Sequence, residues 1–278
     1  MRRGPGRLPR ARRGDLTGYW ERAGLEGAIL DALVAAGYDL DALTLDQLAP
    51  VDEFHSGGKA ATRRLARVAD LRPGTRVLDV GGGLGGPART LALEYGCHVT
   101  VVDLTESYVR AGAALTARLG LADRVAHRVG DARAIETQAG DFDVVWTQNS
   151  GMNIADKRQL YARFARSLGR DGVLALQEPM AGPNAPPIYP LMWARDAGTS
   201  FLESPGEMRA TIERAGFRVL AWEDVTGEFA GAPTVDAIPR HAIQRLVMGD
   251  ALPDIVRAGQ RNREEGRIVT IQAVFRRQ

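Results

Sequence analysis

A glycine-rich turn is the part of this sequence whose residue types and spacing could do chemistry. Asp79 is followed by Gly81, Gly82, Gly83 and Gly85, which gives the pattern D-x-G-x-G-x-G at the end of a valine-rich run. Residues without a Cβ let the backbone turn sharply and approach a ligand, and the helix that should follow presents free N–H groups. Positions 81, 83 and 86 also satisfy the dinucleotide pattern G-x-G-x-x-G. The turn therefore predicts a nucleotide-cofactor site without choosing between cofactors.

Two further acidic residues follow later strand-like runs. Asp103 ends the next run, 20 residues beyond Gly83, where a carboxylate can accept both hydroxyls of a ribose. Asp131 follows the third run, between Gly130 and Ala132, where it can receive the exocyclic amino group of an adenine. Dinucleotide enzymes share the ribose-binding acid, so the residues that discriminate are Asp79 and Asp131.

The elements that must position these residues alternate regularly along the chain. Strand-like runs rich in valine are expected at 77–80, 99–102, 125–129, 144–146 and 173–176. Helical patterns separate them at 86–95, 106–119 and 156–168. Two late strands, at 217–222 and 267–275, flank a long connection that could let the last strand enter the sheet antiparallel. We expect an α/β, Rossmann-like, doubly wound and mostly parallel seven-stranded sheet.

In this order and spacing, the motifs resemble those of the class I S-adenosylmethionine-dependent methyltransferases over about residues 70–225. The resemblance implies that Asp79 and the glycine turn hold the methionine end of the cofactor. It implies that Asp103 binds the ribose. It also implies that Asp131 and Ala132 flank the adenine, with Leu104 packed on the adenine face. The implied cofactor is S-adenosylmethionine.

A narrower resemblance points to the small-molecule branch, which contains the sarcosine/dimethylglycine-type N-methyltransferases. It rests on the segments 53–58, 148–157 and 200–202 and on Trp193. There, the segment before the first core helix closes over the methionine moiety, and the residue matching Gln148 lines the transfer site. Many relatives carry a histidine where Asn149 stands, which leaves the proton acceptor open. His55 could bind the methionine carboxylate or act as the base, so His55, Gln148 and Asn149 are the expected catalytic residues.

The rest of the chain is divided into a basic tail at 1–14, expected to be disordered, an N-terminal helical cap at 15–71, and a methyltransferase domain at 72–278. The apolar stripe of the cap is expected to comprise Leu25, Ile29, Leu30, Leu33 and Val34.

Ligands of open α/β sheets bind beyond the carboxyl ends of the strands. This rule places Gln148, Asn149 and Glu178 around the methyl group, together with a proline-rich loop at 179–204. The loop carries Tyr189, Trp193 and Phe201 and is expected to form a lid over the substrate. The C-terminal helical insertion at 227–266 either completes this lid or forms a helical packing layer.

Composition narrows the class of protein. The chain has 278 residues, of which 45% are hydrophobic and 25% charged, and no run reaches the roughly 18 apolar residues that span a bilayer. Cys97 is the single cysteine, and no histidine or acid spacing resembles a metal site. Removing the six arginines of residues 1–13 from the net charge of +2 leaves −4 for the remainder. We expect a cytoplasmic protein with a small-molecule partner, no nucleic acid, no membrane and no metal. The oligomeric state stays open, with a homodimer as one option.

The expected reaction is methyl transfer to a small amine, hydroxyl or carbon nucleophile by in-line displacement. A base is needed only where the nucleophile must lose a proton. One alternative is an NAD(P)-dependent oxidoreductase, although no Tyr-x-x-x-Lys hydride-relay pair is evident. Another is a noncatalytic methyltransferase-like binding module.

Overall fold

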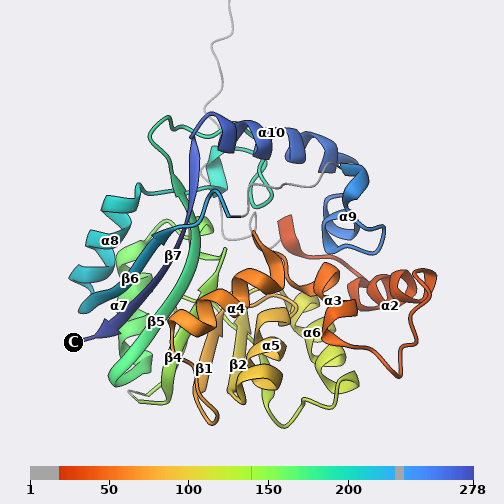
Figure 1. Ribbon diagram of the computed structural model, residues 1–278, viewed down its shortest axis with the longest axis horizontal. Coiled ribbons are helices and arrows are strands. Elements are labelled where there is room, and N and C mark those ends of the chain that lie inside the picture. Colours follow the sequence, from red (N-terminus) through yellow and green to blue (C-terminus); the bar gives the residue numbers. More distant parts are fainter. Residues whose placement is uncertain (1–18, 139, 229–234) are drawn as a thin grey trace, which may run out of the picture.

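The computed structural model describes residues 19–138, 140–228 and 235–278, so the basic tail expected at 1–14 lies outside the described residues. It contains a seven-stranded sheet with the order β3-β2-β1-β4-β5-β7-β6 (Figure 1). The strands are β1 Arg76–Val80, β2 His98–Asp103, β3 Val125–Val129, β4 Phe142–Gln148, β5 Leu168–Ala181, β6 Phe217–Asp224 and β7 Ile268–Arg277. Strands β1 to β5 pair in parallel, whereas β7 is antiparallel to both β5 and β6. The Rossmann-like α/β fold is as expected, but the sheet is mixed.

Side chains of the parallel strands alternate between two apolar faces. Val77 lies beside Val99 and Val144 in the register and packs on one face, whereas Leu78 and Val145 pack on the other. Helices α4 (Gly58–Val68) and α5 (Gly86–Tyr95) cover the first face. Helices α7 (Lys157–Ser167) and α8 (Pro205–Arg214) cover the second, and α6 (Glu106–Arg118) packs against β3. Burial of both faces explains why the central strands are nearly continuous apolar runs.

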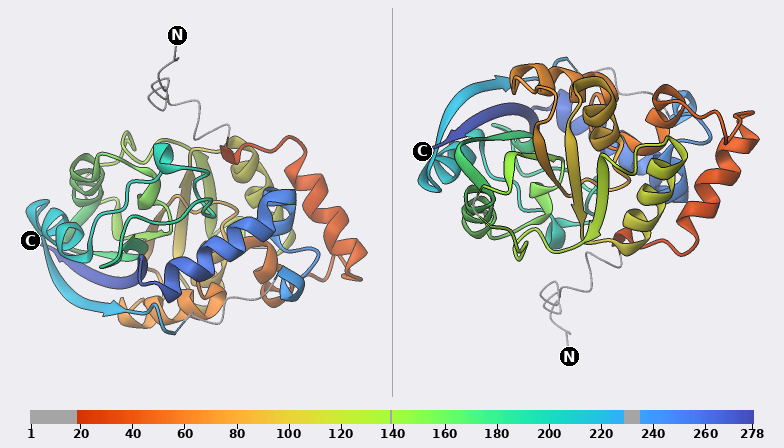
Figure 2. Two further views of the ribbon diagram at one scale, coloured as in Figure 1. Left: turned by 90° about the horizontal axis from the view of Figure 1, so that it is seen from above. Right: turned by 90° about the horizontal axis from the view of Figure 1, so that it is seen from below.

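Segments from both ends of the chain form a further apolar cluster beside the sheet. Helices α2 (Leu25–Ala35) and α3 (Leu45–Asp52) pack there with α9 (Ile243–Met248) and α10 (Leu252–Glu264). Figure 2 shows α10 crossing the molecule between α2 and the end of β7. Within α2 the buried side chains are Leu25, Ile29 and Leu33, whereas Val34 is 56% exposed. The apolar stripe expected from the sequence is therefore narrower, because α2 packs on one side only. No described helix is long and apolar enough to cross a membrane.

The loop expected as a lid begins later than predicted, because β5 continues to Ala181. Asn262 of α10 fastens this loop: its side-chain oxygen accepts from the N–H of Ile188 at 2.7 Å, and its amide nitrogen donates to the carbonyl of Ile188 at 2.8 Å. Leu191 and Trp193 pack with Met152 in a small apolar cluster. The loop is thus held between α10 and the turn that follows β4.

Candidate active site

A cavity of about 990 Å³ opens where the parallel strands end. Its wall combines the turns after β1, β2, β3 and β4, the segment before α4, the loop after β5 and one face of α10. Of the residues expected to bind the cofactor or take part in catalysis, all except Gly85 line this cavity. Gly85 has a φ of 80°, and a Cβ there would lie 2.6 Å from the ring of His127. Gly85 therefore starts α5 against His127 and does not line this cavity, and its assignment to the cofactor site stays a prediction.

The other glycines of the turn are required by the backbone and by a close approach. Gly81 and Gly83 have φ values of 70° and 55°, a region that side chains with a Cβ rarely adopt. A Cβ on Gly82 would lie 2.4 Å from Oδ2 of Asp79. The turn is therefore packed directly on the Asp79 carboxyl group, and its backbone is open to the cavity.

Asp79 is a buried carboxyl group without a complete set of partners. It is 1% exposed, and its Oδ2 has no hydrogen-bond partner among the described residues. Burial raises the pKa of Asp79 to about 8, and the negative charges of Asp103 and Glu53 raise it further. Burying an unpaired carboxylate costs free energy. A cationic group of a ligand in the cavity would offset that cost.

The two later acids are held by hydrogen bonds. Asp103 accepts from the backbone N–H of Gly83 at 3.0 Å and from that of Thr105 at 2.9 Å, while burial raises its pKa. Asp131 is paired with Arg133, whose Nη2 lies 2.8 Å from Oδ2. The backbone N–H and Nε of Arg133 also donate to Oδ1 of Asp131, at 2.9 Å and 3.0 Å. Leu104, 37% exposed, lies on the cavity wall after Asp103.

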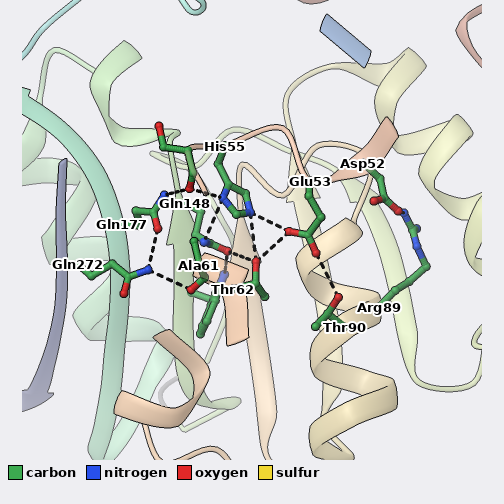
Figure 3. A network of polar contacts seen from close by, with 12 residues as sticks. Asp52, Glu53, His55, Ala61, Thr62, Arg89, Thr90, Gln148, Gln177 and Gln272 are labelled. Atoms are coloured by element: carbon green, nitrogen blue, oxygen red, sulfur yellow. Dashed lines mark hydrogen bonds and ion pairs between the residues drawn. The ribbon is translucent and has the colours of Figure 1, made fainter. Parts of the chain in front are cut away.

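A buried network surrounds His55, as Figure 3 shows. His55 and Glu53 have side chains only 3% and 2% exposed, and Nε2 of His55 lies 2.8 Å from Oε2 of Glu53. The same carboxylate accepts from the hydroxyl of Thr62 at 2.8 Å and from that of Thr90 at 3.1 Å. Since a carboxylate only accepts, Nε2 of His55 carries a proton in this arrangement. Nδ1 of His55 is then the nitrogen left to exchange a proton.

Gln148 faces that second nitrogen. Its Oε1 accepts from the indole N–H of Trp146 at 2.9 Å, which turns its Nε2 toward Nδ1 of His55 at 3.5 Å. On its other side, Nδ1 lies 3.2 Å from the carbonyl of Ser56. A protonated Nδ1 can donate to Ser56, and a bare Nδ1 can accept from Gln148. Both proton states of Nδ1 therefore have a partner.

The segment that carries His55 is fastened to the sheet (Figure 3). Gln177 of β5 donates to the carbonyl of Ser56 at 2.8 Å, and Gln272 of β7 donates to Gln177 at 2.7 Å and to the carbonyl of Ala61 at 3.0 Å. These amides are buried, so each bond replaces one to water. The central strands thus fix where the His55 ring stands.

Asn149, the residue after β4, has a strained backbone conformation. Its φ is 54°, which asparagine tolerates better than most residues. Its backbone N–H donates to the carbonyl of Gln177 at 2.9 Å, and its side-chain Oδ1 is buried without a partner among the described residues. Non-glycine residues held in this region cluster at functional sites. Asn149 therefore presents an unsatisfied amide at the cavity wall.

Glu178 does not line the cavity, contrary to the expectation that placed it around the methyl group. Its Oε1 accepts from the backbone N–H groups of Gly151 at 2.9 Å and Ser150 at 3.3 Å, and burial raises its pKa. Nearby, Nζ of Lys157 donates to the carbonyls of Gly151 and Phe201, both at 2.8 Å, while burial lowers its pKa. Both side chains therefore stabilise the backbone of the cavity wall without lining the cavity.

The part of the cavity farther from the glycine turn is largely apolar. Trp193 and Phe201 of the expected lid line it, whereas Tyr189 does not. The apolar side chains around them are Met152, Leu191, Met192, Ile238, Ile255, Val256 and Ile268. Among the polar groups on this side are Gln244, Asn262 and Arg263, which belong to α9 and α10. The described helices of the insertion therefore contribute to the cavity wall as well as packing on α2.

Sequence reasoning missed Glu53, Thr62 and Arg263. Glu53 and Thr62 come next to the site only because α4 packs against the ends of β4 and β5, a contact between distant segments. Arg263 shares one face of α10 with Gly259 and Val256, and this helical spacing was the available signal.

Comparison with known proteins shows which proteins this chain resembles. Residues 77–172 match the model of a family described as a methyltransferase domain. A glycine/sarcosine/dimethylglycine N-methyltransferase of Actinopolyspora halophila is 31% identical over 182 residues, 64% of this chain and 31% of that relative. A sarcosine/dimethylglycine N-methyltransferase of Halorhodospira halochloris is 29% identical over 192 residues, 66% of this chain and 63% of the relative. The match thus spans less than a third of the first relative's length.

A comparison of three-dimensional structures also finds a methyltransferase. The crystal structure of geranyl diphosphate C-methyltransferase from Streptomyces coelicolor A3(2) has a TM-score of 0.70 and 17% sequence identity, over 98% of this chain and all of that chain (100%). The family match and the shared fold confirm the resemblance to class I S-adenosylmethionine-dependent methyltransferases.

Proposed function

We propose that this chain transfers a methyl group from S-adenosylmethionine to a small-molecule acceptor. The arrangement of Asp79, Asp103 and Asp131 carries the proposal: they lie at the carboxyl ends of three adjacent strands and line one wall of a cavity whose remaining wall is largely apolar. Acids suit a cofactor that is cationic at its sulfonium and ammonium groups. The two relatives from Actinopolyspora halophila and Halorhodospira halochloris are N-methyltransferases, and the structural relative is a C-methyltransferase crystallised with S-adenosyl-L-homocysteine.

Different residues of the chain would bind different parts of the cofactor. Asp79, with the glycine turn, would hold the methionine end, because an ammonium group would neutralise its unpaired oxygen. Asp103 would accept from the ribose hydroxyls. Asp131 and Ala132 would flank the adenine, with Leu104 on the ring face. When bound, S-adenosylmethionine supplies an electrophilic methyl group for in-line displacement.

The proton of the acceptor would pass to Nδ1 of His55. Glu53 holds the opposite nitrogen of the ring, and Gln148 and the carbonyl of Ser56 offer partners to Nδ1 in its two proton states. Asn149 would hydrogen-bond the acceptor through its unsatisfied amide oxygen. The apolar wall excludes water and aligns the reactants, which is the main requirement of this displacement. An amine, a hydroxyl or an activated carbon can serve as the nucleophile.

The oxidoreductase alternative fits the turn less well. A nicotinamide dinucleotide would place its pyrophosphate on the turn, against the buried Asp79 carboxyl that touches Gly82. The N–H of Gly83, which such a phosphate would use, already donates to Asp103. Both observations disfavour an anion at this position.

Release of S-adenosylhomocysteine tests the proposal. The purified chain is incubated with S-adenosylmethionine and separate pools of amines, phenols, sugars, quinones and organic acids. At least one pool should raise the release above the rate without acceptor, and Asp103→Asn should suppress the increase. Binding of S-adenosylhomocysteine without methylation of any pool would favour the noncatalytic module instead.

A further inference from the structure

One face of α10 lines the apolar part of the cavity. Ile255 and Val256 lie near its N-terminal end, Gly259 in the middle, and Asn262 and Arg263 near its C-terminal end. Figure 2 shows this helix crossing the molecule above the sheet. The face therefore changes from apolar to polar along its length, and its polar end carries a permanent positive charge.

The guanidinium of Arg263 has no ion pair and no hydrogen bond with any of the described residues. Burial lowers its pKa, and the negative charge of the neighbouring Glu264, which forms no ion pair with it, offsets only part of this shift. A Cβ on Gly259 would lie 3.7 Å from its Nη1, so the guanidinium folds back along α10 over that glycine. The other arginine that lines the cavity, Arg133, is paired with Asp131. Among the described residues that line this cavity, the cation without an ion pair thus belongs to the wall that α10 contributes.

Neighbouring arginines on α10 behave differently. Arg257 pairs with Asp254, and Arg261 pairs with Glu265 at 2.9 Å, with side chains 69% and 60% exposed. Arginines on the solvent side of the helix are therefore neutralised, whereas the one toward the cavity is not. A partly desolvated guanidinium without a counter-ion is unfavourable unless a ligand supplies one. Guanidinium groups bind carboxylate and phosphate through paired hydrogen bonds.

We propose that Arg263 binds an anionic group of the methyl acceptor, so that the acceptor is a small organic acid with an apolar body. This assignment rests on the proposed methyl transfer and narrows its acceptor class. The anion pairs with the guanidinium at one end of the α10 face, and the apolar body lies along Ile255 and Val256. The negative group is thus held by the positively charged end of the α10 face, whereas the acids of the glycine turn lie on another wall of the cavity.

Calorimetric titration with four eight-carbon probes tests this assignment: octanoate, octyl phosphate, octanol and octylamine. Each is titrated into the full chain, both ligand-free and saturated with S-adenosylhomocysteine. At least one anionic probe should bind about tenfold or more tightly than octanol, the effect of one charged hydrogen-bonded pair. The stronger of octanoate and octyl phosphate identifies the anion. Arg263→Met should abolish the preference, and Arg263→Lys should restore part of it.

Arg261→Met is the matched control, since it removes an exposed arginine from the same helix and should leave all four affinities unchanged. Equal binding of anionic and neutral probes, no binding of either anion up to millimolar concentration, or a preference that survives Arg263→Met would overturn the assignment. Failure of S-adenosylhomocysteine to bind would instead count against the proposed function, and the probes on the ligand-free chain still report on Arg263.

Discussion

Because Asp79 is buried, it makes the stability of the folded chain depend on pH in a way that a surface carboxylate would not. Its folded-state pKa of about 8 lies above the unfolded value of about 3.9. Between these values the folded chain therefore binds more protons at this group than the unfolded chain. The contribution of Asp79 to stability accordingly falls as the pH rises from about 4 through about 8. A cationic ligand should reverse this loss.

Replacing Asp79 with asparagine should have opposite effects on the stability of the chain and on its affinity for the cofactor product. Asp79→Asn should raise the melting temperature of the ligand-free chain by a few degrees at pH 8 and much less at pH 5, because it removes the buried charge. It should also weaken S-adenosylhomocysteine binding by about tenfold or more, because the ammonium loses its partner. Scanning calorimetry and titration measure the two effects. Asp143→Asn is the control of opposite sign, since Arg76 lowers the pKa of Asp143. A less stable Asp79→Asn chain with unchanged affinity would contradict this account.

The pairing of Glu53 with His55 predicts a kinetic effect without a binding effect. Glu53→Gln keeps the size of the side chain but removes the charge that holds Nε2–H of His55. Methyl transfer to an acceptor that must lose a proton should slow by about 100-fold, while the affinity for S-adenosylhomocysteine stays within about twofold. Initial rates and calorimetry measure these quantities. Glu94→Gln, at the exposed pair with Arg63, serves as the control. An equal loss of rate in both variants would remove Glu53 from the mechanism.

At the scale of elements, the turn after β4 depends on the conformation of Asn149. Asn149→Gly should be tolerated, whereas Asn149→Val should lower the free energy of unfolding by about 1–2 kcal/mol, because a β-branched residue is strained at its φ of 54°. Urea denaturation measures both changes. Thr100→Val, within β2, provides a comparison at ordinary strand geometry. Equal stability of the glycine and valine variants would show that the turn relaxes.

The strands around the glycine turn follow directly from the sequence, because both faces of β1, β2 and β4 are buried and their apolar runs are nearly continuous. The ends of β5 do not follow, since Leu168 and Ala181 extend a run predicted only at 173–176. The extension to Ala181 pairs with β7, which comes from the far end of the chain, whereas Leu168 pairs with Phe142 of β4. Local patterns cannot report such a partner.

Some residues of the candidate site can likewise be predicted from the sequence, and others cannot. Asp79, Asp103 and Asp131 could be placed because each lies at or just after the carboxyl end of a strand, so the topology brings them to one edge. The Glu53–His55 pairing and the direction of Arg263 depend on how helices pack on distant strands. The contact of Gly85 with His127 also comes from a distant element, β3. The sequence therefore predicts residues at strand ends better than residues presented by helices and loops.

At the scale of the whole molecule, a buried ion pair joins the N-terminal helices to the core. Arg89 of α5 lies 2.6 Å from Asp52 at the end of α3, and both side chains are almost fully buried. Arg89 also donates to Thr116 of α6 at 2.9 Å. Burial raises the pKa of Asp52 to about 6 despite the attraction of Arg89. One guanidinium thus ties three helices together beside the cavity.

Breaking this pair should destabilise the whole chain. Arg89→Met leaves Asp52 buried and unpaired, which should lower the free energy of unfolding by about 3–5 kcal/mol. The double variant Asp52→Asn/Arg89→Met should recover part of the loss, because no charge stays unpaired. Guanidinium denaturation at pH 8, where Asp52 is ionised, measures both. Arg63→Met, at an exposed pair, should cost about 1 kcal/mol or less. A double variant no more stable than Arg89→Met would show that packing, not charge, dominates.

The most direct test of the central claim is calorimetric titration of the purified chain with S-adenosylhomocysteine and, separately, with NAD. The acids at the ends of β1, β2 and β3 predict tight, one-to-one binding of S-adenosylhomocysteine that Asp103→Asn weakens strongly, and no measurable binding of NAD. Binding of NAD without binding of S-adenosylhomocysteine would contradict the assignment of this cavity to methyl transfer.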